Sequence, residues 1–132
     1  MMVVARTLLD MAVSDRDLYL FDTFEGMSAP TEEDRDHRGE AAAVRFTRTR
    51  VGEDSADWCR AGIVDVRANL DRTSYPCDLL HMVKGKVEET IPQHAPDPIA
   101  LLRLDTDWYE STKHELEHLW PRLVPGWYLH YR

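Results

Sequence analysis

The stretch PIALLRLDTDWYEST at residues 98–112 decides the fold that this sequence predicts. Its first half is a near-continuous apolar run, which is typical of a buried strand, and Asp105 ends that run. A helix is predicted to follow as far as Leu119, and the Ser-Thr pair at 111–112 with Glu115 forms a candidate cap and capping box. The predicted order is therefore strand, acidic loop and helix.

The same alternation of strands and helices is predicted along the rest of the chain. Apolar runs at 18–21 and 79–83 predict two further strands, helical spacing predicts helices over 3–12 and 56–70, and residues 127–131 begin another strand. Such alternation favours an α/β fold whose parallel sheet is covered on both faces. Residues 23–57, rich in charge, Gly and Pro, predict a long loop with at most a short helix.

Length and charge narrow the class of protein. The 132 residues, 43% of them hydrophobic, suit one globular domain. A net charge of −8 argues against nucleic acid or an anionic membrane as the main partner and favours a small molecule. Apolar runs fall well short of the roughly 20 residues that span a bilayer, and the first residues lack the pattern of a signal peptide. We therefore expect a cytoplasmic protein.

The acidic loop after the apolar run contains two carboxylates that suit a reactive site. Asp105 and Asp107 are alternate residues, so in an extended segment both are expected to face one pocket. Carboxylate oxygens suit Mg²⁺, and a second carboxylate can accept the proton of a metal-bound hydroxyl. Alternatively, both residues simply cap the helix that follows.

A second acid, Asp22, directly follows the predicted strand at 18–21. An acid in this position can accept two hydrogen bonds from the vicinal ribose hydroxyls of a nucleotide-type cofactor. Alternatively, it is a solvent-facing turn residue. Because ligands collect beyond the carboxyl ends of parallel strands, Asp22 and Asp105 are expected at the same edge of one parallel sheet.

The sequence HELEH at 114–118 also matches the HExxH pattern of zinc hydrolases. A zinc hydrolase needs a third ligand, and the sequence after His118 offers only His130, without the glycine spacing of metzincins. We therefore expect His114 and His118 to be partly exposed and to bind no metal, and the zinc hydrolase stands as an alternative to test.

Three blocks of this sequence together carry a family resemblance. They are DLYLFDTFEGM at 17–27, VKGKVEETIP at 83–92 and IALLRLDTDWYESTKHELEHLWPRLVPG at 99–126. With these blocks the chain resembles the macrocin O-methyltransferase (TylF-like) family of class I S-adenosylmethionine-dependent methyltransferases. The resemblance implies a Rossmann-like class I methyltransferase sheet. It also implies Mg²⁺-assisted methyl transfer from S-adenosylmethionine to a sugar or similar natural-product hydroxyl.

The resemblance also implies roles for individual residues. Asp22 would lie near the cofactor, and the backbone from Gly85 to Val87 would lie on the adenine side of its pocket. Asp105 would be a metal ligand. Asp107 would be the base that takes the proton of the acceptor hydroxyl.

The sequence departs from the family pattern at both ends. The family's glycine-rich turn would lie before Met1, and PGWYLHYR at 125–132 replaces the segment that leads to its last metal ligands. The resemblance therefore implies a truncated sheet and a single partial domain over 1–132, with a gap where the first strand belongs. Either the Asp22 and Asp105 strands pair directly, or another polypeptide, such as a second copy in a homo-oligomer, fills the gap. A non-catalytic fragment or partner-binding remnant is the corresponding alternative function.

Overall fold

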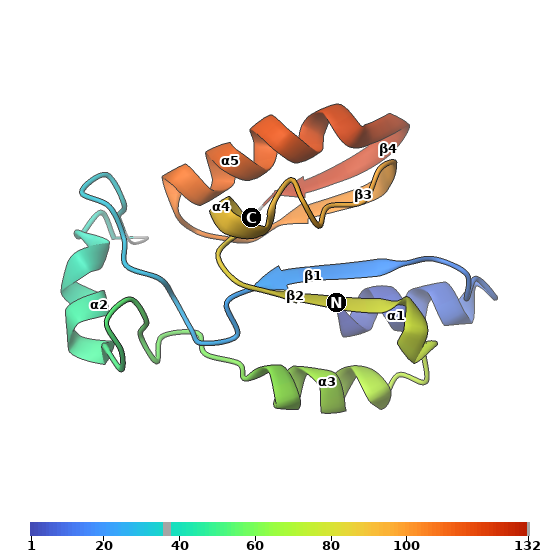
Figure 1. Cartoon of the computed structure of the whole chain (residues 1–132), viewed down its shortest axis with the longest axis horizontal. Helices are drawn as coiled ribbons and strands as arrows, with labels where there is room; N and C mark the ends of the chain where they lie inside the picture. The colour runs from blue at the N-terminus through green and yellow to red at the C-terminus, as the bar shows by residue number, and fades with distance from the viewer. Residues whose placement is uncertain (36–37, 132) are drawn as a thin grey trace.

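A computed structural model describes residues 1–35 and 38–131. Its elements are α1 (Met2–Asp10), β1 (Leu18–Asp22), α2 (Ala42–Thr49), α3 (Ile63–Asp71), β2 (Leu80–Lys84), α4 (Val87–Thr90), β3 (Ile99–Leu104), α5 (Tyr109–Leu119) and β4 (Leu123–Tyr131). Short 3-10 turns at Cys77–Leu79 and Trp120–Arg122 precede β2 and β4. The predicted alternation of helices and strands is confirmed (Figure 1).

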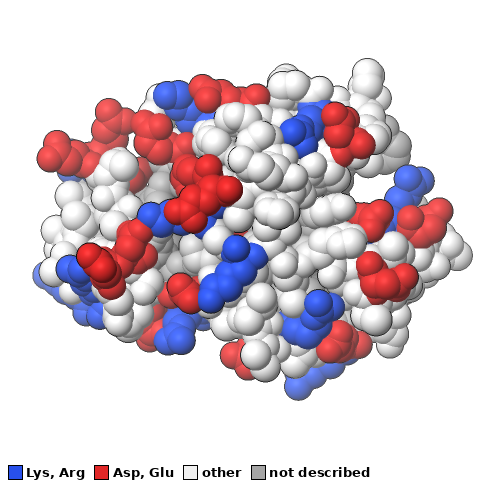
Figure 2. Space-filling view, in the orientation of Figure 1, with Lys and Arg blue, Asp and Glu red and all other residues white. Residues whose placement is uncertain are grey.

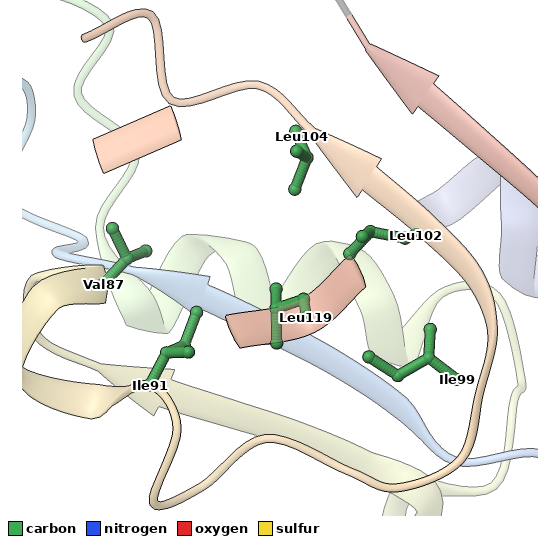
Figure 3. Packing of buried hydrophobic residues seen from close by; sticks show 6 residues of the cluster. All are labelled: Val87, Ile91, Ile99, Leu102, Leu104 and Leu119. Atoms are coloured by element: carbon green, nitrogen blue, oxygen red, sulfur yellow. The ribbon is translucent and has the colours of Figure 1, made fainter. Parts of the chain in front are cut away.

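The strands form two separate parallel pairs rather than one sheet. β1 pairs with β2, with Asp22 opposite Lys84, and β3 pairs with β4, with Leu104 opposite Tyr131. The prediction that Asp22 and Asp105 follow strands of one sheet is therefore wrong, and so is direct pairing of their strands. Within the described residues no strand joins β1 to β3, so each keeps one edge without a ladder. Even so, the arrows of β1 and β3 point the same way (Figure 3).

β1 contacts a hydrophobic cluster on each of its faces, because its side chains alternate in direction along the strand. Leu18 and Leu20 pack with residues of α1 and α3, whereas Phe21 packs against the cluster between α5 and β3. The first cluster has as its buried members Ala5, Leu18, Leu70, Tyr75 and Leu80, and the second has Val87, Ile91, Ile99, Leu102, Leu104 and Leu119 (Figure 3). Helices thus cover the β1–β2 pair from one side and the β3–β4 pair from the other (Figure 1).

The two faces of β3 differ in exposure. Leu102 and Leu104 are buried in the cluster with Leu119 of α5. Leu101, which lies opposite Tyr128 of β4, is 50% exposed. The β3–β4 pair therefore has one buried face and one face with exposed apolar side chains.

α3 begins later than its sequence pattern predicts. The helix was predicted over 56–70, but α3 begins at Ile63, after Gly62 in an extended conformation. Ala56 instead forms an isolated antiparallel bridge with Met27, and its amide donates to the Met27 carbonyl at 3.0 Å. A distant backbone partner has therefore taken residues whose local pattern favoured a helix.

α5 begins earlier than predicted, and the predicted capping box is wrong. The helix starts at Tyr109, so the Ser-Thr pair at 111–112 lies inside its first turn and makes no side-chain cap. Asp34, from the long loop, accepts the Tyr109 amide in its place at 2.9 Å. Glu115 is directed to Thr106 instead, at 2.9 Å.

The segment at 23–57 contains α2 and is tied to the rest of the molecule by charged contacts. Glu25 accepts a hydrogen bond from Lys84 at 2.6 Å, and Asp54 pairs with Lys86. Figure 2 shows acidic side chains gathered at the upper left, where Figure 1 places this segment and the start of α5. None of the helices in the described part of the chain is long and apolar enough to cross a membrane.

We expect the stability of this fold to fall with rising pH because of Glu115. This side chain is 6% exposed, and burial raises its pKa from 4.5 to about 7. Glu88 raises this pKa further, while the hydrogen bond from Thr106 lowers it. Because the pKa of Glu115 is higher in the folded state, protonated Glu115 adds its full contribution to the free energy of unfolding below about pH 4.5. That contribution is lost as the pH rises through about 7.

Glu115→Gln should therefore gain stability relative to the wild type between about pH 4.5 and 8, by at most about 3 kcal/mol. Urea unfolding across this pH range measures the difference. Glu117→Gln, at an exposed position on the same helix, is the control and should follow the wild type. A pH-independent difference between Glu115→Gln and wild type would contradict the assignment.

Candidate active site

Asp22 and Gly85 lie together at the carboxyl ends of β1 and β2. The Gly85 amide donates to the Asp22 carbonyl at 3.0 Å, which extends the ladder by one step. The carboxylate of Asp22 is exposed, and its Oδ1 accepts the Phe24 amide at 2.6 Å. This hydrogen bond fixes the orientation of the carboxylate, and Oδ2 accepts none from the described residues.

Gly85 permits a backbone conformation that other residues rarely adopt. Its φ is +144°, and a Cβ here would lie 2.9 Å from Cγ2 of Thr90. Val87 begins α4 with its side chain buried in the core. Lys86, between them, has a partly exposed side chain that pairs with Asp54.

Asp105 directly follows β3 and pairs with Arg103 of that strand. Arg103 Nη2 donates to Asp105 Oδ2 at 2.6 Å. Burial lowers the pKa of the Met1 amino group. The charge of Arg103 lowers this pKa further, while the charge of Asp105 raises it. The start of α1 is thus close to the end of β3.

Asp107 lines an open cavity of about 750 Å³. The cavity lies between the long loop and α5, and its lining residues are Glu33, Asp34, Arg35, Asp107, Trp108, Tyr109, Thr112, Lys113, Leu116 and Glu117. Asp105 is not among them, so the prediction of one pocket for both carboxylates fails for this cavity. The reason is that Asp107 has φ +66°, and the backbone turns there instead of remaining extended.

Thr106, between the two acids, is tied to α5. Its hydroxyl donates to Glu115 Oε2 at 2.9 Å and lies 3.2 Å from the hydroxyl of Thr112. Sequence reasoning missed this function of Glu115 because it placed the residue in a capping box. The recurrence of Ser111, Glu115 and Leu119 at four-residue intervals was the available signal, since these three residues form the buried side of α5.

Asp34 and Trp108 join the long loop to the start of α5. Asp34 accepts the Tyr109 amide, and the Trp108 indole donates to the Ser28 carbonyl at 3.2 Å. Trp108 also meets Trp58 edge to face, with ring centroids 5.6 Å apart. Sequence reasoning missed Asp34 because nothing in the acidic stretch distinguishes it from its neighbours.

The HELEH histidines make contacts with the backbone. His114 Nε2 lies 2.9 Å from the Ile91 carbonyl oxygen, and His118 Nδ1 lies 2.9 Å from the His114 carbonyl oxygen. Both side chains are partly exposed. Glu115, which would be the base of a zinc hydrolase, is buried against Thr106. Within residues 1–35 and 38–131, no three His, Cys, Asp or Glu side chains are grouped to hold a metal ion.

Three known proteins to which this chain is similar are all O-methyltransferases. The mycinamicin III 3''-O-methyltransferase of Micromonospora griseorubida is 27% identical over 114 residues, which are 86% of this chain and 42% of that protein. The demethyldecarbamoylnovobiocin O-methyltransferase of Streptomyces niveus is 27% identical over 117 residues, which are 89% of this chain and 41% of that protein. The 8-demethyl-8-(2,3-dimethoxy-alpha-L-rhamnosyl)-tetracenomycin-C 4'-O-methyltransferase of Streptomyces olivaceus is 43% identical over 61 residues, 46% of this chain and 23% of that protein.

A solved structure is similar to this one. The structure of the O-methyltransferase NovP matches with a TM-score of 0.76 and 25% sequence identity, and the match covers 97% of this chain and 49% of the NovP chain. The chain spans less than half the length of the curated relatives that it matches. The model of the macrocin O-methyltransferase (TylF) family matches residues 1–130. The chain therefore belongs to the macrocin O-methyltransferase (TylF) family, and its α/β fold matches about half of a solved O-methyltransferase.

Proposed function

We propose that this chain carries the acceptor side and part of the donor side of an enzyme that methylates a sugar or similar natural-product hydroxyl with S-adenosylmethionine. The observation that carries the proposal is the position of Asp107, a carboxylate in the wall of an open cavity just beyond the end of β3. Family membership supports methyl transfer over zinc hydrolysis.

The residues at the ends of β1 and β2 fit the proposed donor. When bound, S-adenosylmethionine supplies an activated methyl group on a sulfonium. The oriented, exposed carboxylate of Asp22 would accept hydrogen bonds from vicinal ribose hydroxyls. The backbone from Gly85 to Val87 would contact the adenine side, because it directly follows β2 beside the end of β1.

The cavity beside Asp107 suits a polar acceptor with apolar surfaces. Tyr109, which is 55% exposed, and Leu116 offer apolar contact, while Lys113 and Glu117 offer hydrogen bonds to hydroxyls. Asp107 would accept the proton of the acceptor hydroxyl while the oxygen of that hydroxyl takes the methyl group, and the carbon–sulfur bond of the sulfonium would break to leave S-adenosylhomocysteine. The rest of the catalysis is alignment, which the residues around the cavity would supply.

Mg²⁺ assistance is a further proposal that this chain's own donors do not complete. Asp105 offers one carboxylate, but its Oδ2 already accepts from Arg103. Mg²⁺ is strongly hydrated, and a single carboxylate competes poorly for it. We therefore propose Asp105 only as one metal ligand, which others outside the described residues would complete.

A non-catalytic, partner-binding role is the second candidate. Each of β1 and β3 has one edge that no strand of the described residues pairs with, which favours this role because an unpaired edge readily accepts another strand. That strand could come from a second copy in a homo-oligomer.

We also propose a cytoplasmic location, as expected for an enzyme that uses S-adenosylmethionine.

Asp107→Asn should lower the turnover of methyl transfer by about a hundredfold or more, the usual effect of losing a general base. The measurement is transfer of a labelled methyl group to a sugar-bearing acceptor, in the protein of full family length that carries these residues. Asp97→Asn, an exposed acid before β3, is the control and should retain turnover. Full turnover in Asp107→Asn would refute its role as base.

Asp22→Ala should weaken binding of S-adenosylhomocysteine by about tenfold to a hundredfold, because charge-assisted hydrogen bonds to two hydroxyls are lost. Calorimetry on the protein of full family length measures this effect, with Asp15→Ala as the control.

The 132-residue chain should show no saturable binding at micromolar concentrations, because few contacts remain to offset the cost of immobilising the ligand. Micromolar binding by the 132-residue chain would show that the donor site is complete within it.

A further inference from the structure

Asp34 is a buried acid inside an exposed, highly charged segment. Its exposure is 5%, whereas Glu32, Glu33 and Arg35 beside it are exposed. Burial of an ionised carboxylate is costly unless hydrogen bonds replace the water that it loses. The contacts around Asp34 must therefore compensate for its burial.

Both carboxylate oxygens of Asp34 have strong donors. Oδ2 accepts the amide of Thr31 at 2.7 Å and its hydroxyl at 2.9 Å. Oδ1 accepts the amide of Tyr109 at 2.9 Å, across 75 positions of sequence. Hydrogen bonds to an ionised acceptor are about twice as strong as neutral ones. We name these three hydrogen bonds the Asp34 clamp.

The Asp34 clamp acts at the start of α5, two residues after Asp107. The Tyr109 amide belongs to the first turn of the helix, where amides have no partner within the helix. The main chain of Asp34 also contributes, because its carbonyl accepts the Ala42 amide at the start of α2 at 3.1 Å. One residue thus links the long loop, α2 and α5.

Asp34 also lies between two cavities. With Trp108 it lines the 750 Å³ cavity beside Asp107 and a smaller one of about 270 Å³. Lys86 and Glu88, which flank Val87, line the smaller cavity. Asp34 and Trp108 therefore separate the proposed acceptor side from the side of α4.

We infer that Asp34 is a positioning residue, which holds the loop wall of the acceptor cavity and the backbone turn of Asp107 in one arrangement. The inference rests on the proposed function, since it assigns the cavity to the acceptor. The groups proposed for the donor, Asp22 and Gly85, are held by their own contacts on β1 and β2. Loss of the Asp34 clamp should therefore affect the acceptor far more than the donor.

The clamp itself can be tested on the 132-residue chain by amide hydrogen exchange. Asp34→Ala removes all three hydrogen bonds, and Asp34→Asn keeps the shape but replaces one acceptor by a donor. Protection of the Tyr109 amide should fall by about tenfold or more in Asp34→Ala and less in Asp34→Asn. Glu32→Gln, an exposed acid in the same loop, is the control and should leave protection unchanged. Unchanged protection in both Asp34 variants would overturn the clamp, and Asp34→Asn alone decides if Asp34→Ala does not fold.

The positioning role can be tested by kinetics on the protein of full family length. In Asp34→Asn the KM for the acceptor should rise by about tenfold, while affinity for S-adenosylhomocysteine should stay within about twofold. Equal losses on the donor and acceptor sides, or no change in either, would overturn positioning even with the clamp confirmed. If the wild type transfers no methyl group, the proposed function fails and positioning fails with it, while hydrogen exchange still decides the clamp.

Discussion

The packing of both strand pairs depends on one constraint, that strands of a parallel sheet favour apolar cover on both faces. β1 meets it by alternation, with Leu18 and Leu20 in the cluster under α1 and α3 and Phe21 in the cluster under α5. β3 meets it on one face, and Leu101 on its other face remains half exposed. The positions of the acids follow from these strands, because Asp22 and Asp105 come where the apolar runs end.

Two buried acids, Glu115 and Asp34, position the backbone around the two exposed acids Asp105 and Asp107. Glu115 holds Thr106, which lies between Asp105 and Asp107, and Asp34 holds Tyr109 just beyond them. The exposed acids are thus fixed by backbone and neighbours rather than by contacts of their own with the core. Such an arrangement leaves Asp107 accessible from the cavity while its main chain is held on both sides.

The chain belongs to the TylF family and spans less than half the length of the relatives that it matches. The β1–β2 and β3–β4 pairs have their strands in the same direction but share no ladder within the described residues. Each pair nevertheless retains its helices, and Phe21 of β1 reaches the cluster around β3. The fold is therefore recognisable from packing even where hydrogen bonding between the pairs is absent.

The sequence by itself determined β1, β2 and β3, the helices α1 and α5, and the acids that follow β1 and β3, because local apolar spacing is enough to specify such elements. It predicted β4 only from residue 127, whereas β4 begins at Leu123. The family resemblance rests on the sequence blocks at 17–27, 83–92 and 99–126. Only the tertiary structure decided that α3 begins at Ile63, that the strands form two pairs, and that Asp34 replaces the predicted cap. These features depend on partners tens of residues apart, such as Met27 with Ala56 and Asp34 with Tyr109, and no local pattern encodes such contacts.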